Sequence, residues 1–250
     1  MEVKTAAIYN RSASKWSRNE PVSLSDYTGR PAVFKRCGDV TGLKIADLGC
    51  GEGYCARLLS DAGAAQIDGI DISEGMIYRA NAAKTGSHRA SFQVGEITNI
   101  PLPSASYDIA IGVFVYNYLS VEQTGVSFQE VHRLLRADGR FIFCVPHPSL
   151  PFIRKEQSPP FYFAFERGGY FSNRDIRADG KIWRRDGQEL PVEMHHKLLK
   201  DYFDALRSAG FSQMPEVEEL GVTQEILKID PNFFGPLFDI PLHLLIEVKK

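Results

Sequence analysis

This sequence of 250 residues has few of the features that would point to a metal centre, a membrane segment or a nucleic-acid surface. It has only four cysteines, and no group of Cys, His and Asp residues shows the spacing of metal ligands. A net charge of −2 with well-mixed signs offers no electrostatic footprint for nucleic acid or an anionic membrane. No apolar run approaches the ~18 residues of a membrane span, and the first residues lack a signal-peptide core. We therefore expect a cytoplasmic monomer or homodimer without a metal ion.

The most informative stretch is a glycine-rich turn at residues 46–53, Ala-Asp-Leu-Gly-Cys-Gly-Glu-Gly. The apolar run that leads into it predicts a buried strand. Gly49, Gly51 and Gly53 then supply positions where a Cβ would block a close approach or an unusual backbone conformation. From Tyr54 the apolar residues take helical spacing, and Gly63 stands where a C-terminal cap belongs. The pattern predicts a strand, a loop that a ligand approaches closely, and a helix.

The spacing of these glycines distinguishes three kinds of ligand loop. A dinucleotide site expects Gly-x-Gly-x-x-Gly, whereas the third glycine here comes one residue early. A P-loop needs Lys followed by Ser or Thr after the last glycine, and Tyr54-Cys55 stands there instead. The form from Asp47 to Gly53 resembles the cofactor loop of the class I S-adenosylmethionine-dependent methyltransferases, in their small-molecule, methyltransferase type 11-like branch.

Two acids follow this loop in the order that the resemblance implies. Asp71 ends a second predicted strand, where an acid can accept both ribose hydroxyls of an adenosyl cofactor. The alternative is that Asp71 only belongs to the cap of the next helix, for which Ser73 is a good N-cap. Glu96 follows a third predicted strand and matches the family's residue near the adenine amino group; the alternative is an exposed turn acid. The resemblance implies a site for S-adenosylmethionine formed by Tyr9, Asp47, Gly49, Cys50, Gly51, Gly53, Asp71, Ile72, Met76, Glu96, Ile97 and Val113.

A fourth predicted strand, introduced by Tyr107-Asp108, resembles the family's fourth strand, which runs into the loop between the cofactor and the methyl acceptor. We expect Asp108 to be a structural acid. In the family, the residues after this strand contact the acceptor; here they are Phe114, Tyr116, Asn117 and Tyr118. A helix, a turn at residues 137–139 and a fifth strand at residues 140–145 follow in the family's order. We expect an α/β fold with a Rossmann-like, doubly wound sheet of seven strands, the last of them antiparallel and next to the fifth.

Two additions accompany this core. Residues 148–194 form a connection far longer than a typical loop and are rich in aromatic residues. Asp179-Gly180 and Asp186-Gly187 signal tight turns, so we expect a β-rich insert after the fifth strand that covers the acceptor. Its predicted acceptor contacts are Tyr170 and Trp183. Alternatively, the aromatic residues only give a small lobe its own core. Residues 1–40 are predicted to form a helical cap that brings Tyr9 to the cofactor, and residues 41–250 the methyltransferase domain.

The predicted reaction is direct displacement, because the sulfonium of the cofactor already makes its methyl group electrophilic. Alignment of the acceptor can then suffice, and Arg11 and Arg30 are candidates to bind the cofactor carboxylate. If a base is used, we predict His147, since histidine has an unperturbed pKa of about 6.5; a turn hydrogen bond is its alternative role. The expected acceptor is an oxygen, nitrogen or carbon atom of a small, aromatic or heterocyclic metabolite. Alternatives are a nucleic-acid or protein methyltransferase, or a non-catalytic module with the cofactor fold.

Overall fold

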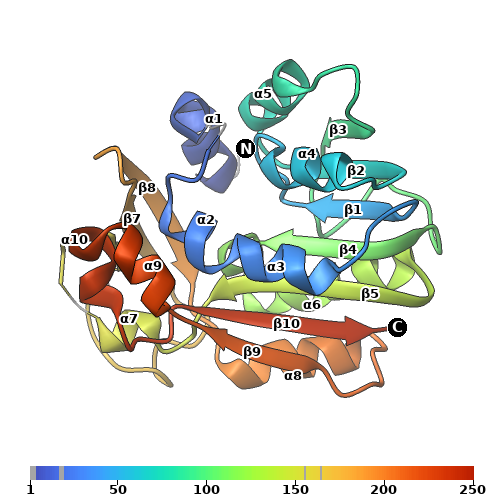
Figure 1. Cartoon of the computed structure of the whole chain (residues 1–250). Coiled ribbons are helices and arrows are strands. Elements are labelled where there is room, and N and C mark those ends of the chain that lie inside the picture. Colours follow the sequence, from blue (N-terminus) through green and yellow to red (C-terminus); the bar gives the residue numbers. More distant parts are fainter. Residues whose placement is uncertain (1–3, 17–19, 155, 164) are drawn as a thin grey trace.

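The computed structural model describes residues 4–16, 20–154, 156–163 and 165–250, which form two sheets surrounded by helices (Figure 1). The larger sheet has seven strands in the order β3-β2-β1-β4-β5-β10-β9. These strands are β1 (Lys44–Leu48), β2 (Gln66–Asp71), β3 (Ala90–Val94), β4 (Tyr107–Val113), β5 (Leu135–Pro146), β9 (Glu216–Leu220) and β10 (His243–Lys249). β1 to β5 are parallel, whereas β10 is antiparallel to both β5 and β9. The predicted fold class is therefore confirmed.

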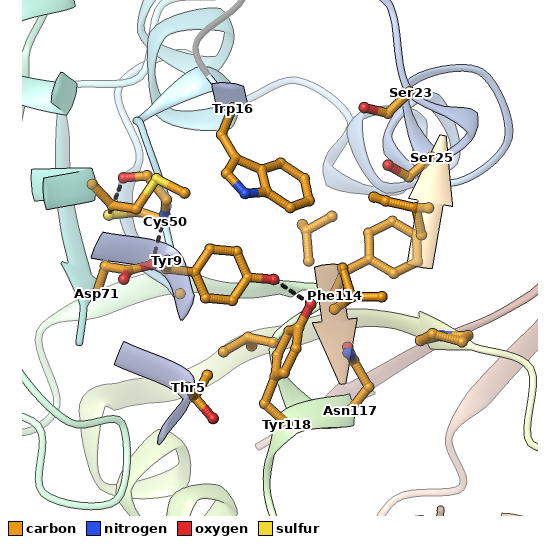
Figure 2. A pocket seen from close by; sticks show the side chains of 18 of the residues that line it. Thr5, Tyr9, Trp16, Ser23, Ser25, Cys50, Asp71, Phe114, Asn117 and Tyr118 are labelled. Atoms are coloured by element: carbon orange, nitrogen blue, oxygen red, sulfur yellow. Dashed lines mark hydrogen bonds between the residues drawn. The ribbon is translucent and has the colours of Figure 1, made fainter. Parts of the chain in front are cut away.

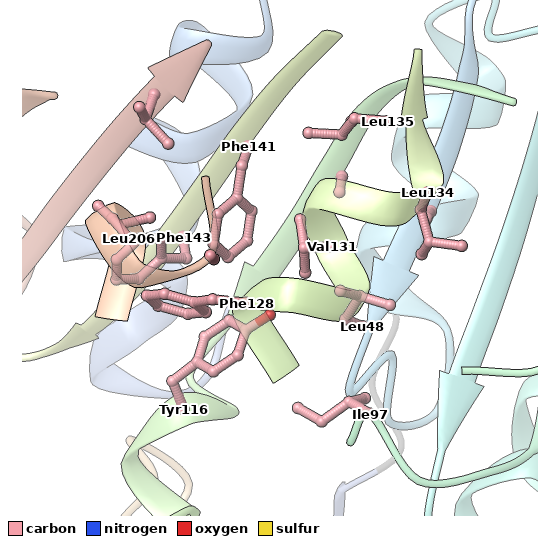
Figure 3. Packing of buried hydrophobic residues seen from close by; sticks show 14 of the residues in the cluster. Leu48, Ile97, Tyr116, Phe128, Val131, Leu134, Leu135, Phe141, Phe143 and Leu206 are labelled. Carbon is pink, nitrogen blue, oxygen red and sulfur yellow. The ribbon is translucent and has the colours of Figure 1, made fainter. Parts of the chain in front are cut away.

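Helices cover both faces of this sheet, because successive side chains of each strand point to opposite sides. The helices are α1 (Lys4–Trp16), α2 (Leu24–Thr28), α3 (Arg30–Cys37), α4 (Tyr54–Asp61), α5 (Glu74–Ala83), α6 (Val121–Leu134), α7 (Leu150–Ile153), α8 (Leu199–Ser208), α9 (Gln224–Ile229) and α10 (Pro231–Phe234), with short 3-10 helices η1 (Tyr116–Tyr118) and η2 (Gly235–Leu237). On β5, Ile142 packs with residues of α3, α4 and α5, and its neighbour Phe143 packs with α6 and α8. Figure 3 shows the second of these clusters, in which Phe128, Phe141 and Phe143 gather.

The insert forms a separate antiparallel sheet in the order β6-β7-β8. Its strands are β6 (Phe161–Phe163), β7 (Arg177–Trp183) and β8 (Glu189–His195). Asp186-Gly187 makes the predicted turn between β7 and β8, with Gly187 at a φ of 82°. The turn predicted at Asp179-Gly180 was wrong, since both residues lie inside β7. A Cβ at Gly180 would lie 2.5 Å from Cδ1 of Phe163, so this glycine makes room for an aromatic ring on the paired strand.

The boundary of β5 also differs from the prediction. The strand begins at Leu135, and the expected turn at residues 137–139 lies within it as an irregularity, with Asp138 at a φ of 63°. Extra residues in one strand can form a β-bulge while the strand stays paired with its neighbours. Asp108 has the predicted structural role, because its carboxylate accepts from the amide of Lys44 (2.8 Å) and pairs with Arg136. These contacts hold β1, β4 and β5 in register below the site.

Candidate functional site

A cavity of about 280 Å³ lies at the carboxyl ends of β1, β2 and β4, where open α/β sheets bind their ligands. Its walls come from the loops after these strands, from α1, from the segment around α2 and from the insert sheet. Figure 2 shows Tyr9 reaching across the pocket from the side of Asp71 toward Tyr118. Segments from all parts of the chain therefore meet at one edge of the sheet.

The glycine loop has the left-handed backbone geometry that its sequence predicts. Gly49, Gly51 and Gly53 have φ values of 70°, 56° and 80°, which other residues rarely adopt. A Cβ at Gly49 would lie 2.4 Å from Val115, and one at Gly53 would lie 2.8 Å from Phe92. A Cβ at Gly51 would meet nothing within 4 Å. Two of the glycines are thus required by packing, and Gly51 leaves open space on the cavity wall.

Asp71 is fixed between this loop and the start of α5. One carboxylate oxygen accepts from the amide of Gly51 and the other from the amide of Ser73, both at 2.9 Å. Burial raises the pKa of Asp71, and the two amides oppose that shift. Ser73 itself caps α5 by accepting from Met76 (3.1 Å), so Asp71 is not needed as the cap. Because a carboxylate can accept about four hydrogen bonds, lone pairs of Asp71 remain for a ligand.

A carboxylic acid, Asp47, and an arginine, Arg30, lie beside the loop, and each has a hydrogen-bonding atom without a partner among the described residues. Burial, followed by the charge of Asp71, raises the pKa of Asp47 to about 7, and its Oδ2 has no partner within the described part of the chain. Arg30 donates through one guanidinium nitrogen to Ser25 (2.5 Å) and Asp26 (2.8 Å), and its Nε has no partner among residues the structure describes. Arg11 does not line the cavity and donates to the carbonyl of Ala7 in its own helix. Arg30 is therefore the better placed of the two candidate arginines.

All but one of the predicted cofactor residues line the cavity. Those that line the cavity are Tyr9, Asp47, Gly49, Cys50, Gly51, Asp71, Ile72, Met76, Glu96, Ile97 and Val113. Gly53 is absent from the wall; it is the N-cap of α4, and its α-carbon faces Phe92 and Ala80. The structure thus brings together residues that are spread over more than a hundred positions of the sequence.

Aromatic residues after β4 form the opposite wall. Phe114 has a φ of 59°, an uncommon conformation for a residue with a large side chain. A Cβ on Gly29 would lie 2.6 Å from the Phe114 ring, so glycine is required where α2 meets α3. The hydroxyls of Tyr9 and Tyr118 form a hydrogen bond, and their rings meet edge to face with centroids 5.5 Å apart. This contact joins α1 to the loop that follows β4.

The insert at residues 148–194 contributes an apolar wall. Its lining residues are Leu150, Pro160, Phe161, Phe163, Ile182, Trp183 and Val192. Trp16 and Leu24 line the cavity as well, and sequence reasoning did not select any of these residues except Trp183. The alternation of Phe161 and Phe163 on a short strand was a signal that could have identified them, because such residues share one face. A ligand at this end of the cavity would meet rings and aliphatic side chains.

Two predicted acceptor contacts lie elsewhere. Tyr116 is completely buried in the core, where its ring packs against Phe128 and Phe143 (Figure 3). It turns inward because a 3-10 helix follows the left-handed residue at 114, so only its neighbours line the cavity. Tyr170 packs against His196 and accepts from the amide of Leu199 (2.9 Å). These two residues are therefore corrections to the predicted acceptor site.

The predicted base is also displaced from the cavity, and a different histidine lines it. His147 interacts with Ser149 (2.6 Å) and Glu219 (2.8 Å) beyond the end of β5, so we withdraw it as a base. His243 lines the cavity at the start of β10. The Thr28 hydroxyl donates to the carbonyl of Leu24 and therefore accepts from Nε2 of His243 (2.7 Å). Burial lowers the pKa of His243 to about 3, so its imidazole is neutral near pH 7.

Comparison with known proteins places this arrangement in a family. Residues 45–139 match a family described as a methyltransferase domain. An uncharacterised protein from Haemophilus influenzae is 29% identical over 241 residues, covering 93% of this chain and 91% of that protein. A demethylmenaquinone methyltransferase from Lactococcus lactis is 29% identical over 84% of this chain and 82% of its own length. A crystal structure of an S-adenosylmethionine-dependent methyltransferase from Mesorhizobium loti has 26% identity and a TM-score of 0.68, covering 88% of this chain and 96% of that one.

The fold and the site together define a methyltransferase with a Rossmann-like sheet. The chain belongs to the class I S-adenosylmethionine-dependent methyltransferase superfamily, and it is an enzyme with S-adenosylmethionine as its cofactor. In the described ranges, no helix has the length and apolar character needed to cross a membrane.

Proposed function

We propose that this enzyme transfers a methyl group to a small, uncharged, aromatic or heterocyclic acceptor at an oxygen, nitrogen or carbon atom. The observation that carries the proposal is the division of the cavity into two ends. Carboxylates, an arginine and an open glycine loop surround one end, whereas rings and aliphatic side chains surround the other. A zwitterionic, hydroxyl-bearing cofactor suits the first end, and a flat apolar molecule suits the second.

The unused polar atoms fit S-adenosylmethionine. In our proposal, the ribose hydroxyls donate to Asp71, Gly51 allows the backbone to approach the ligand, and Glu96 accepts from the adenine amino group. Arg30 then pairs with the cofactor carboxylate through its unpartnered Nε, and Asp47 provides negative charge near the ammonium and sulfonium. The cofactor supplies a methyl group that a nucleophile can take by direct displacement. In this arrangement, described residues would meet the ribose, the adenine amino group, the carboxylate and the two cationic groups of the cofactor.

The protein's contribution to the reaction is then mainly positioning. We propose that residues 41–250 are the methyltransferase domain, with residues 1–40 as a cap and residues 148–194 as the acceptor wall. Phe161, Phe163 and Trp183 would stack against the acceptor, and Asn117 and Tyr118 would orient it opposite the sulfur. Alignment of this kind can account for ~7–11 kcal/mol of barrier reduction without a general base. Relatives named demethylmenaquinone methyltransferase support a small-molecule acceptor.

A turnover screen tests the proposal. The protein is incubated with S-adenosylmethionine and a panel of quinols, phenols, heterocycles and small acids, with demethylmenaquinone among them because of the relatives, and methylated products are detected by mass spectrometry. We expect a ring compound without a charged group to be methylated. If only charged aliphatic acids, RNA or protein substrates were methylated, the proposed acceptor class would be wrong.

A further inference from the structure

Helix α1 lies across the cavity between the two halves of the site, and few of its residues are buried. Figure 1 shows α1 between α5 on one side and the insert strands β7 and β8 on the other. The buried residues of α1 are Ala6, Ser12 and Ala13, which are all small. A helix of this length is only marginally stable alone. Polar contacts with its neighbours therefore add to the packing of Tyr9 against Tyr118 and of Trp16 against the insert side of the core in holding α1 in place.

One such contact joins α1 to the cofactor end of the site. Oδ1 of Asn10 accepts from the hydroxyl of Ser73 (2.7 Å) and from the amide of Gly75 (3.1 Å). A Cβ on Gly75 would lie 3.3 Å from the Asn10 Cα, so the backbones approach closely here. Ser73 also donates its amide to Asp71. Asn10 is thus connected through one residue to the carboxylate proposed to bind the ribose.

The other contact joins the start of α1 to the insert. Glu193 of β8 accepts from the hydroxyl of Thr5 (2.6 Å) and pairs with Arg177, and Lys4 lies 3.8 Å from it. The Glu193 side chain is only 2% exposed, yet it does not line the cavity. The sequence of α1 contains no acid, and an anion near the first turn of a helix is stabilising. Glu193 therefore supplies negative charge that α1 itself lacks, together with the exposed Asp179, which lies 3.2 Å from Lys4.

We propose that Asn10 and Glu193 are positioning residues that hold α1 across the cavity and thereby couple cofactor binding to closure of the acceptor site. α1 carries Thr5, Tyr9 and Trp16, all of which line the cavity. A ligand that stabilises the turn from Asp71 to Ser73 favours docking of α1, and a docked α1 completes the wall around both ligands. By linkage, each event strengthens the other. This inference rests on the proposed function, because it assumes that both ligands occupy this cavity.

S-adenosylhomocysteine, the reaction product, tests the coupling without knowledge of the acceptor. Hydrogen exchange in residues 4–16 and calorimetric affinity are measured on the full chain. We expect the ligand to slow exchange in α1 by ~5-fold or more, the lower range of common coupling factors. Glu193→Gln should speed exchange in α1 and raise the dissociation constant by ~5-fold or more, although Glu193 lies outside the cavity. Asn10→Ala should abolish the ligand-dependent protection.

Glu189→Gln is the matched control, because Glu189 lies on the same strand and pairs with Lys181 instead of α1. It should leave exchange and affinity unchanged. Glu193→Gln removes the charge but keeps an accepting oxygen, whereas Thr5→Val removes the hydrogen bond itself and keeps the test valid if Glu193→Gln folds poorly. If the ligand bound and exchange in α1 did not change, or if Glu193→Gln and Thr5→Val both behaved like Glu189→Gln, the coupling would be refuted. Failure of the unchanged protein to bind the ligand would instead refute the proposed cofactor site.

Discussion

Replacement of Asp71 by alanine tests the proposed cofactor site directly. Its carboxylate accepts from the amides of Gly51 and Ser73, both at 2.9 Å, and so ties the glycine loop to the first turn of α5. In the proposed complex, its remaining lone pairs accept hydrogen bonds from the two ribose hydroxyls. The substitution therefore removes two contacts to the cofactor and loosens the loop against which the cofactor lies.

The expected magnitude follows from the ordinary strength of hydrogen bonds to a charged group. Each contributes a net ~1.5–3 kcal/mol, so the loss of two corresponds to ~3 kcal/mol or more. Since ~1.4 kcal/mol is a factor of ten in affinity, the dissociation constant of S-adenosylmethionine should rise by ~100-fold. A water molecule that replaced one contact would still leave an effect of about tenfold.

Isothermal titration calorimetry measures this change. Thermal denaturation of the same samples shows whether Asp71→Ala remains folded. Glu74→Ala is the control, because Glu74 is an exposed acid at the start of the same helix and does not line the cavity. An affinity that was unchanged in Asp71→Ala, or that fell equally in both variants, would show that the ribose site has been misplaced.

Three further predictions concern other parts of the cavity. Burial raises the pKa of Asp47 to about 7 in the folded state. Between about pH 4 and 7 the folded state therefore binds more protons than the unfolded state, and the protein loses stability as the pH rises through this range. Asp47→Asn should therefore stabilise the protein more at pH 8 than at pH 5 in thermal melts, and a pH-independent gain would contradict the assignment. Gly51→Ala should weaken cofactor binding by about tenfold with a modest loss of stability. Gly53→Ala should lower the melting temperature further, because its Cβ would meet Phe92. Equal melting temperatures for the two variants would contradict this reasoning. Trp183→Ala should raise the KM of the acceptor more than the dissociation constant of the cofactor, and the reverse order would place Trp183 at the wrong end of the site.

The cofactor loop could be predicted from the sequence because its geometry is a local property. A strand, three glycines at alternate positions and a helix occupy consecutive residues, and each glycine has the positive φ that its spacing suggested. The placement of Asp71 at the end of the next strand is local as well. No long-range contact is needed to recognise either feature.

The acceptor end depends on how distant segments meet. His147 follows β5 directly, whereas His243 begins β10, nearly a hundred residues later. Antiparallel pairing of β10 with β5 places His243 opposite Pro146, and only His243 lines the cavity. Which of the two histidines lines the cavity could not be predicted without that pairing.

By itself, the sequence determined the fold class, the geometry of the glycine loop and the order of the elements, because glycine spacing and hydrophobic periodicity act over a few residues. The tertiary structure decided which side chains reach the cavity. Phe114 and Tyr118 line it but Tyr116 enters the core, since the left-handed residue at 114 and the following 3-10 helix set their directions. The contacts of α1 with Ser73 and Glu193 likewise join segments that are far apart in the chain. Side-chain direction and long-range docking arise from packing, which local patterns do not encode.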